Sequence, residues 1–222
     1  MVSQATEDYL KIIYKLQRKR QQVKTSDLAL ARQVTPASVT NMVKKLARMR
    51  LLVYTSYRGV ELMPAGEKIA LRVIRLHRLL ELYLKEALGY SWDRVHEEAE
   101  KLEHHISEEF EERIFEALGR PAFDPHGDPI PTKEGEVHEA NFTPLSDAES
   151  GDLGTICRVD DGNPELLRYL AKIGLVPKVT VEVLERAPFS GPLTVKVGDF
   201  EHVVGRDVAA NISVASMETA DS

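Results

Sequence analysis

The chain has 222 residues, and its content of 43% hydrophobic and 29% charged residues is ordinary for a soluble protein with a buried core. Its single cysteine, Cys157, excludes an internal disulfide and any cysteine-based zinc motif, and it fits a reducing compartment. The sequence shows neither a signal-peptide pattern nor an apolar run of bilayer length, so we expect a cytoplasmic protein with no membrane partner.

The charge is distributed unevenly along the chain. Residues 1–75 contain 15 Lys and Arg against 5 Asp and Glu, whereas residues 76–222 contain 14 against 30. A basic N-terminal part on an acidic body indicates that only the N-terminal part binds a polyanion such as double-stranded DNA.

The N-terminal part shows the pattern of a winged helix-turn-helix. Apolar residues recur at helical spacing over 7–19 and again over 26–33, and a third helix is expected to begin at Pro36. The break before the third helix is short, and this helix exposes small polar and basic residues, as a recognition helix does. Alternating residues at 52–54 and 60–62 then predict a hairpin wing, which a plain three-helix bundle would not need.

The side chains expected to contact DNA come from these helices and from the tip of the wing. Small polar residues near the start of the third helix are placed to reach base edges, and basic residues are placed to reach phosphates. The expected base contacts are Ser38, Thr40 and Asn41. The expected phosphate contacts are Thr25, Lys44, Lys45, Arg48 and Arg58.

Three further helices are expected after the wing, over residues 65–88, 95–106 and 107–118. Their apolar faces are larger than one small domain needs, so we expect the protein to form a homodimer through them.

The helix expected over residues 95–106 is rich in imidazole and carboxylate groups. At about 100° per residue, four of its side chains would share one stripe. They are His96, Glu100, Glu103 and His104. His77 and Glu81 form a second pair, four residues apart on the preceding helix. Such nitrogen and oxygen donors suit a divalent transition metal, but Glu-rich helices are more often simply solvated, so the rest of the chain must decide.

The last hundred residues change character. Residues 121–144 are rich in proline and predict a linker or an ordered loop, in which His126 and His138 have no spaced partners and are expected to be solvent-exposed. A short helix over 164–173, together with several short strands, predicts a small SH3-like barrel. The expected strands are residues 154–159, 179–184, 193–197, 202–204 and 212–215.

The predicted fold is mainly α with small β parts. The expected divisions are a winged helix-turn-helix DNA-binding domain (1–75), a helical metal-binding and dimerisation domain (76–120), a Pro-rich linker (121–144) and an SH3-like, or FeoA-like, domain (145–222).

Six segments are specific in combination: VTPASVTNMVKKL, YRGVELMPAGEKIA, RLHRLLE, VHEEAEKLEHHISEEFEERI, HGDPIP and GNPELLRYLAKIGLVP. With them, the chain resembles the diphtheria-toxin-repressor family of metal-dependent transcriptional regulators over nearly its whole length. The resemblance implies a cytoplasmic homodimer that binds a palindromic operator when it holds a divalent metal, and we expect it to repress metal-uptake genes.

The resemblance also implies two sets of metal ligands. The metal-sensing set would be Asp8, Glu100, Glu103 and His104, and the second set would be His77, Glu81 and His96. Iron-responsive members of the family present a thioether and a thiol where this chain has Asp8 and Glu100, whereas manganese-responsive members present carboxylates. Because hard oxygen donors suit Mn²⁺, we predict Mn²⁺ as the effector and Fe²⁺ as the second choice, with Zn²⁺, Cd²⁺ and Co²⁺ as further occupants in vitro.

Two departures from the family pattern affect these sites. Lys11 stands where the manganese branch often has a glutamate, and because a charged ammonium cannot ligate a metal, we predict two separate mononuclear sites. The usual ligands from the SH3-like domain are not clearly matched; Asp160 and Asp161 are the nearest candidates, but solvated loop carboxylates are the favoured interpretation.

Two other functions stay open at this point. Residues 96–100 begin like a zinc-protease motif, which would suggest a metal-dependent hydrolase, but Glu100 replaces the second histidine and no nucleophile motif is found. The chain could also be a winged-helix regulator that metal does not control. We expect a DNA-binding regulator rather than an enzyme, in which the metal holds the first helix and fixes the two recognition helices about one DNA turn apart.

Overall fold

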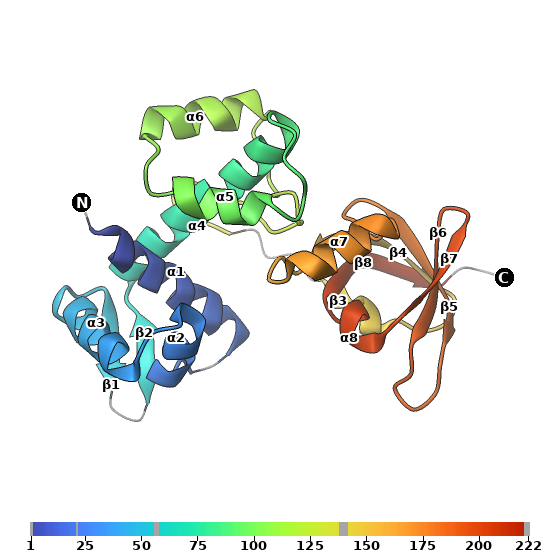
Figure 1. Ribbon diagram of the computed structural model, residues 1–222, viewed down its shortest axis with the longest axis horizontal. Coiled ribbons are helices and arrows are strands. Elements are labelled where there is room, and N and C mark those ends of the chain that lie inside the picture. Colours follow the sequence, from blue (N-terminus) through green and yellow to red (C-terminus); the bar gives the residue numbers. More distant parts are fainter. Residues whose placement is uncertain (1, 21, 56–57, 138–141, 220–222) are drawn as a thin grey trace. The chain divides into compact units, whose positions relative to one another are not determined.

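The computed structural model describes the chain except for residues 1, 21, 56–57, 138–141 and 220–222 (Figure 1). The chain divides into two compact units, which are described separately below. The first comprises Met1–His77, Glu103–Ile106 and Pro131–Val137. The second comprises Arg78–Leu102, Ser107–Ile130 and His138–Ser222. Within the described residues, no helix has both the length and the apolar character that a membrane span requires.

Three helices form the beginning of the first unit: α1 (Gln4–Lys19), α2 (Thr25–Arg32) and α3 (Pro36–Arg48). Their apolar faces meet in one core, in which Leu10, Leu28 and Leu46 are fully buried. The side chain of Thr35 accepts a hydrogen bond from the backbone N–H of Ser38 at 3.3 Å and so caps α3. The short turn between α2 and α3 confirms the predicted helix-turn-helix.

The predicted wing is also present. Strands β1 (Leu52–Thr55) and β2 (Gly59–Leu62) pair in antiparallel fashion. Gly59 has a φ of 88°, and a Cβ at this position would lie 2.2 Å from the carbonyl oxygen of Val23. Only glycine therefore allows the wing to pack against the segment before α2. The remainder of the wing tip lies outside the described residues, but Arg58 is described and exposed.

Helix α4 (Pro64–Glu86) begins in the first unit and continues into the second. In the first unit, Arg75 donates a hydrogen bond to the carbonyl oxygen of Pro131 at 2.8 Å and so ties the segment Pro131–Val137 to this helix. In the second unit, α4 is followed by α5 (Val95–Leu102) and α6 (Glu108–Ala117).

The expected helix over residues 95–106 is shorter than predicted, since α5 ends at Leu102 and Glu103–His105 form a turn. Ser107 has an extended backbone with a ψ of 160°, and its side chain accepts a hydrogen bond from the N–H of Phe110 at 3.2 Å. Because an N-cap residue cannot continue the preceding helix, this cap requires the chain to leave α5 before it enters α6.

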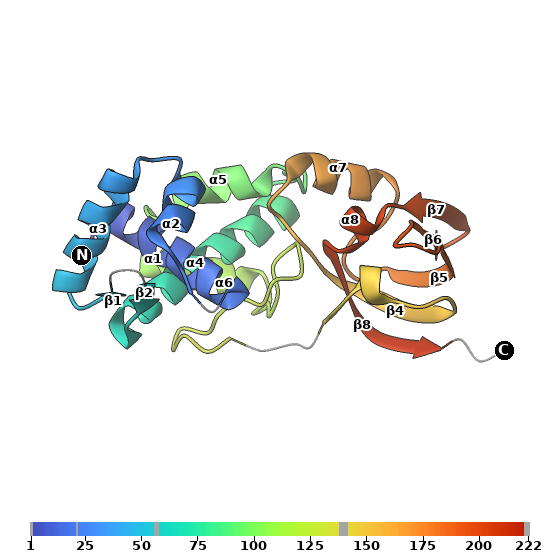
Figure 2. The same ribbon diagram turned by 90° about the horizontal axis from the view of Figure 1, so that it is seen from below.

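The C-terminal part of the second unit is the predicted SH3-like domain, built on one antiparallel sheet in the strand order β3-β8-β4-β5-β6-β7. Its strands are β3 (Thr143–Pro144), β4 (Asp152–Val159), β5 (Thr180–Arg186), β6 (Leu193–Val197), β7 (Phe200–Val204) and β8 (Ile212–Thr219). Helix α7 (Pro164–Lys172) lies along one side of the sheet (Figure 2) and buries Leu167 and Leu170 in the core of the domain. The 3-10 helix η1 (Leu145–Asp147), α8 (Arg206–Ala209) and β3 were not predicted, because two to four residues are too few to show a periodicity.

The proline-rich stretch before the sheet is an ordered loop over residues 121–130. The N–H of Val159 in β4 donates to the carbonyl oxygen of His126 at 2.8 Å, and a Cβ on Gly127 would lie 1.8 Å from the carbonyl oxygen of Cys157. This close contact with β4 buries His126 completely, so the prediction that it is solvent-exposed is wrong. His138 lies outside the described residues.

Candidate metal centre

The first unit contains a buried cluster of imidazole and carboxylate groups, which we name the first cluster: Asp8 of α1, and Glu103 and His104 of the turn after α5. His104 Nε2 lies 2.8 Å from Asp8 Oδ1 and 3.1 Å from Glu103 Oε1. The side chains of Glu103 and His104 are 0% and 3% exposed. One donor atom from each residue lies within 4.8 Å of the others, which makes a nitrogen and oxygen set of the kind that divalent cations bind.

Both carboxylate oxygens of Glu103 have buried partners. Lys11 Nζ lies 2.5 Å from Oε1, and His77 Nδ1 lies 2.5 Å from Oε2. The sequence placed His77 in the other ligand set, and that assignment stays a prediction; in the first unit its Nδ1 contacts Glu103. An imidazole that hydrogen-bonds a ligating carboxylate fixes the direction of that ligand.

Asp8 connects the first cluster to the helix-turn-helix. Its Oδ1 faces His104, while its Oδ2 lies 3.2 Å from Nη1 of Arg32 at the end of α2. The guanidinium of Arg32 also lies over the ring of Tyr9, 5.5 Å from the ring centre. Glu7, which sequence reasoning missed, lies with its Oε2 2.6 Å from His104 Nδ1. The sequence could have indicated Glu7 through its position next to Asp8 in the first turns of α1.

The prediction that four side chains share one stripe of a helix is wrong, because Glu103 and His104 lie beyond the end of α5. They approach Asp8 from a turn and not from a helix face. Glu100 remains on α5 in the second unit, where its Oε1 lies 4.0 Å from His96 Nε2. Its inclusion with Asp8 in one metal site stays a prediction.

The second unit contains another group of donors, which we name the second cluster: Glu81 of α4, His96 of α5 and Asp161 after β4. His96 Nδ1 lies 3.0 Å from Glu81 Oε1 and 3.4 Å from Asp161 Oδ2. Burial by itself would lower the pKa of His96, but the hydrogen bonds and charges of Asp161 and Glu81 outweigh it and raise this pKa to about 10. Asp161 therefore interacts with His96 and is not simply a solvated loop carboxylate. Asp160, the neighbouring candidate, instead accepts a hydrogen bond from the N–H of Gly162 at 3.0 Å.

His126 lies close to the second cluster and was missed by sequence reasoning. Its side chain is fully buried, and neither ring nitrogen has a hydrogen-bond partner among the residues that the structure describes. Burial lowers the pKa of His126, although the charges of Glu81 and Asp161 act in the opposite direction, so the ring is neutral. A buried polar group without a partner costs about 1–3 kcal/mol. A neutral imidazole beside two carboxylates is thus a further candidate ligand for a cation.

The loop that carries His126 is held in shape by Asp124. Its Oδ1 accepts hydrogen bonds from the N–H groups of His126 and Asp128 at 2.8 and 2.9 Å. Burial raises the pKa of Asp124 well above its usual range, and the charges of Glu81 and Asp128 raise it further. Asp128 in turn lies 3.2 Å from Arg78 and 2.9 Å from Arg158, so the loop is bound to both α4 and β4.

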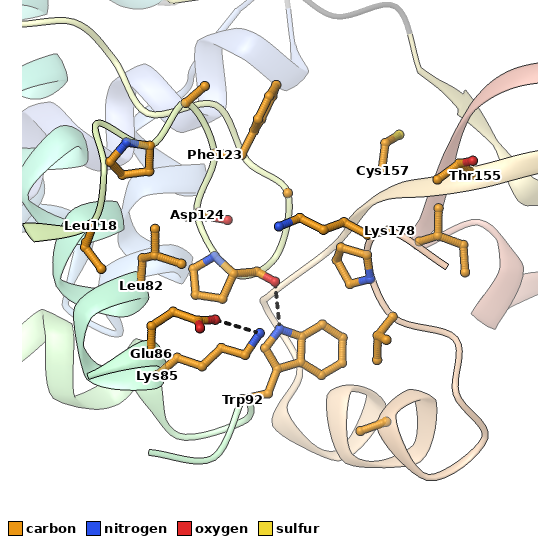
Figure 3. A pocket seen from close by; sticks show the side chains of 18 of the residues that line it. Leu82, Lys85, Glu86, Trp92, Leu118, Phe123, Asp124, Thr155, Cys157 and Lys178 are labelled. Carbon is orange, nitrogen blue, oxygen red and sulfur yellow. Dashed lines mark hydrogen bonds and ion pairs between the residues drawn. The ribbon is translucent and has the colours of Figure 1, made fainter. Parts of the chain in front are cut away.

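A cleft of about 960 Å³ adjoins this loop (Figure 3). Trp92 lines this cleft, and its indole stacks on the imidazole of His126 with ring centres 5.3 Å apart. Its Nε1 donates to the carbonyl oxygen of Pro125 at 3.1 Å (Figure 3). The lining is mixed, with Leu82 and Phe123 beside Lys85 and Lys178. Among the described residues, the groups of donors that could hold a metal ion include none of the residues that line this cleft.

The residues predicted to contact DNA lie on α2, α3 and the wing. Most are exposed: Ser38, Asn41, Lys44, Lys45, Arg48 and Arg58. Thr25 and Thr40 are half-buried, and the hydroxyl of Thr40 donates to the carbonyl oxygen of Pro36 at 2.8 Å. The exposed members are free of the core and available to a partner, but their contact with DNA stays a prediction.

Three family models match successive parts of the chain. Residues 1–60 match the N-terminal DNA-binding domain of iron-dependent repressors, residues 63–132 match their metal-binding and dimerisation domain, and residues 143–216 match the FeoA domain.

Two curated relatives match this chain over different lengths. The HTH-type transcriptional regulator MntR of Lysinibacillus sphaericus is 40% identical over 118 residues, which cover 53% of this chain and 84% of that protein. The iron-dependent repressor IdeR of Mycobacterium tuberculosis is 30% identical over 210 residues, which cover 89% of this chain and 90% of that protein.

Solved structures agree with these relatives. A manganese-dependent transcriptional repressor in complex with manganese is 38% identical, with a TM-score of 0.87, and the match covers 95% of this chain and 99% of the other. ScaR with bound Cd²⁺ is 35% identical, with a TM-score of 0.80, and the match covers 95% and 98%. The proteins matched are named regulators and repressors, which removes the hydrolase alternative. The chain belongs to the diphtheria-toxin-repressor family of metal-dependent, DNA-binding transcriptional regulators.

Proposed function

We propose that this protein is a manganese-responsive transcriptional repressor, which binds a palindromic operator as a homodimer in the cytoplasm when its clusters hold divalent cations. The observation that carries this proposal is the first cluster, where Asp8 faces His104 with one oxygen and Arg32 of α2 with the other. The donors that would receive a cation are thereby in direct contact with the helix-turn-helix.

The ligand chemistry supports Mn²⁺ as the physiological ion. In the first site we assign Asp8, Glu103 and His104 as ligands, with Glu100 as the predicted fourth. The second site would use the predicted His77, Glu81 and His96, together with Asp161 and His126. All of these donors are nitrogen or oxygen atoms, which suits Mn²⁺, then Fe²⁺, and also admits Zn²⁺, Cd²⁺ or Co²⁺ in vitro.

The coupling between metal and DNA follows from the charges around Asp8. Glu7, Asp8 and Glu103 bring three carboxylates around one imidazole, that of His104. A divalent ion among them would supply positive charge that favours this arrangement. Asp8 then stays in place between the turn at residues 103–106 and Arg32, so that α1 and α2 keep the arrangement that DNA binding requires. If metal favours the DNA-binding arrangement, DNA must favour metal binding by the same factor.

On the DNA side, the assignment keeps the predicted division of the chain. Residues 1–75 would form the DNA-binding domain, 76–120 the dimerisation domain, 121–144 the linker and 145–222 the SH3-like domain. Ser38, Thr40 and Asn41 would contact bases, and the predicted basic residues would contact phosphates. In the homodimer, two α3 helices about 34 Å apart would match the half-sites of a palindrome.

The test is operator binding at controlled metal concentration. DNA fragments selected from a random pool in the presence of Mn²⁺ serve as probes, and fluorescence anisotropy is measured against titrated Mn²⁺, Fe²⁺ and Zn²⁺, with an EDTA control. The proposal expects sequence-selective binding that Mn²⁺ strengthens by tenfold or more, on the order of typical allosteric coupling. Equal binding in EDTA would instead support a winged-helix regulator that metal does not control.

A further inference from the structure

The first cluster already contains a cation that belongs to the chain. Lys11 Nζ lies 2.5 Å from Glu103 Oε1, and the two side chains are 4% and 0% exposed. The same oxygen lies 3.1 Å from His104 Nε2, so it faces the point where the donors of the cluster converge. Lys11 therefore contacts the oxygen of Glu103 that is placed to bind a metal.

The position of Lys11 determines how its charge acts on an incoming cation. A positive charge that contacts the same carboxylate oxygen as a divalent ion would repel that ion strongly when water is excluded, because the surroundings have a low effective dielectric constant. The same charge stabilises the carboxylate of Glu103 when no other cation neutralises it. Both effects weaken metal binding relative to a protein in which Lys11 is neutral.

Arg32, another cation near the cluster, differs in this respect. It approaches Asp8 Oδ2, the oxygen that faces away from His104, and its side chain is 32% exposed. Solvent screens its charge more effectively than that of Lys11. Lys11 is therefore the residue whose charge most directly opposes a cation in the first cluster.

We propose that Lys11 is a built-in competitor of the metal, which sets the concentration of Mn²⁺ at which the first cluster fills. When metal is scarce, Lys11 forms an ion pair with Glu103. When metal is abundant, the divalent ion must bind Glu103 beside Lys11 or displace Lys11 from it. This inference rests on the proposed cation site at Asp8, Glu103 and His104. It assigns to Lys11 a role in tuning the site beyond its inability to ligate.

The test compares Mn²⁺ binding by the full-length wild type and charge variants, with free Mn²⁺ measured by electron paramagnetic resonance. Asp8→Asn identifies the phase of the binding curve that belongs to the first cluster. Lys11→Met removes the charge and keeps the length of the side chain, and Lys11→Gln keeps a hydrogen-bond donor toward Glu103 if the Met variant folds poorly. Lys15→Met, one helical turn further along α1, is the matched control for charge on the same helix.

The proposal expects Lys11→Met and Lys11→Gln to tighten the Asp8-dependent phase by about tenfold or more, because a buried like charge has been removed. It also expects Lys11→Met to lower the melting temperature in EDTA, since Glu103 then lacks this counter-charge. Lys11→Arg and Lys15→Met should bind Mn²⁺ much as the wild type does. Unchanged or weaker Mn²⁺ binding in both neutral variants would overturn the role of Lys11. Absence of an Asp8-dependent phase in the wild type would overturn the proposed metal site and this inference with it.

Discussion

The two clusters differ in how fully the protein itself satisfies their polar groups. In the first cluster, both oxygens of Glu103 and both oxygens of Asp8 face a cationic or imidazole partner: Lys11, His77, His104 and Arg32. Beside the second cluster, His126 is fully buried, and neither of its ring nitrogens has a hydrogen-bond partner among the described residues.

This difference indicates two roles. A cluster whose carboxylate oxygens already have partners in the protein binds a cation appreciably only when the cation is abundant, which suits a sensor with a threshold. A cluster with an unpartnered buried imidazole gains a missing interaction when a cation binds, which suits a site that stays filled. The second cluster also joins α4, α5 and the segment after β4, so a cation there would connect the helical part of the second unit to its SH3-like domain.

The largest expected effect comes from breaking the first cluster. Asp8→Ala should reduce Mn²⁺-activated operator binding by roughly a hundredfold, as expected for loss of a metal ligand or of its immediate support. The fold should be retained, because Asp8 lies at the edge of the core with its side chain 12% exposed. Operator affinity measured at a fixed low concentration of free Mn²⁺, with circular dichroism as the control for folding, checks this. Operator binding at the wild-type level would show that Asp8 does not mediate activation.

The next effect concerns the second cluster. His126→Leu should weaken its Mn²⁺ binding by roughly ten- to a hundredfold, while in EDTA the variant should be as stable as the wild type or more stable by about 1 kcal/mol. The substitution removes a metal ligand, which weakens Mn²⁺ binding, but it also removes a buried imidazole without a partner, which does not destabilise the metal-free protein. Thermal unfolding in EDTA and in Mn²⁺ gives both values, and His105→Leu, at an exposed histidine, is the control. If His126→Leu is equally destabilising under both conditions, His126 has a packing role only.

A smaller effect is expected where the first cluster meets the helix-turn-helix. Arg32→Gln removes the charge that links α2 to Asp8. We expect operator affinity at saturating Mn²⁺ to fall by about tenfold, within the usual range of coupling free energies, while Mn²⁺ still binds. Metal binding and operator binding are measured in parallel to distinguish a role in coupling from a role in metal binding. Proportional loss of both would show that Arg32 supports the metal site and does not couple it to DNA binding.

The smallest effect is expected on the DNA surface. Lys44→Ala should lower affinity by a few-fold for all sequences and reduce the slope of log affinity against log salt by about one, because one phosphate contact is lost. Anisotropy titrations at several salt concentrations on selected and unrelated DNA check this. An unchanged slope would remove Lys44 from the phosphate contacts.

The sequence predicted the main elements because each has a clear periodicity. The apolar faces of α1, α3, α4 and α7 and the alternation in the wing were sufficient for the winged helix-turn-helix and the SH3-like domain. The end of α5 at Leu102 could not be predicted from the Glu and His spacing, because the cap at Ser107 and the burial of Glu103 determine it.

The candidate sites were only partly visible in the sequence. Asp8 and Glu103 are far apart in the chain, so no local pattern joins them, and only the family resemblance did so. His126 lies in a proline-rich loop without spaced partners, and its burial depends on contacts with Trp92 and β4 that form only in the folded chain. Polar residues in loops show no periodicity, so the sequence pattern alone could not identify them as site residues.

The most direct test of the account is whether DNA and Mn²⁺ reinforce each other. Operator DNA is added to the protein at a free Mn²⁺ concentration that half-fills the Asp8-dependent phase, and free Mn²⁺ is followed by electron paramagnetic resonance. The account predicts that operator DNA causes uptake of Mn²⁺, by the same factor by which Mn²⁺ strengthens operator binding, and that Asp8→Ala abolishes this uptake. Operator binding with no change in free Mn²⁺ would contradict it.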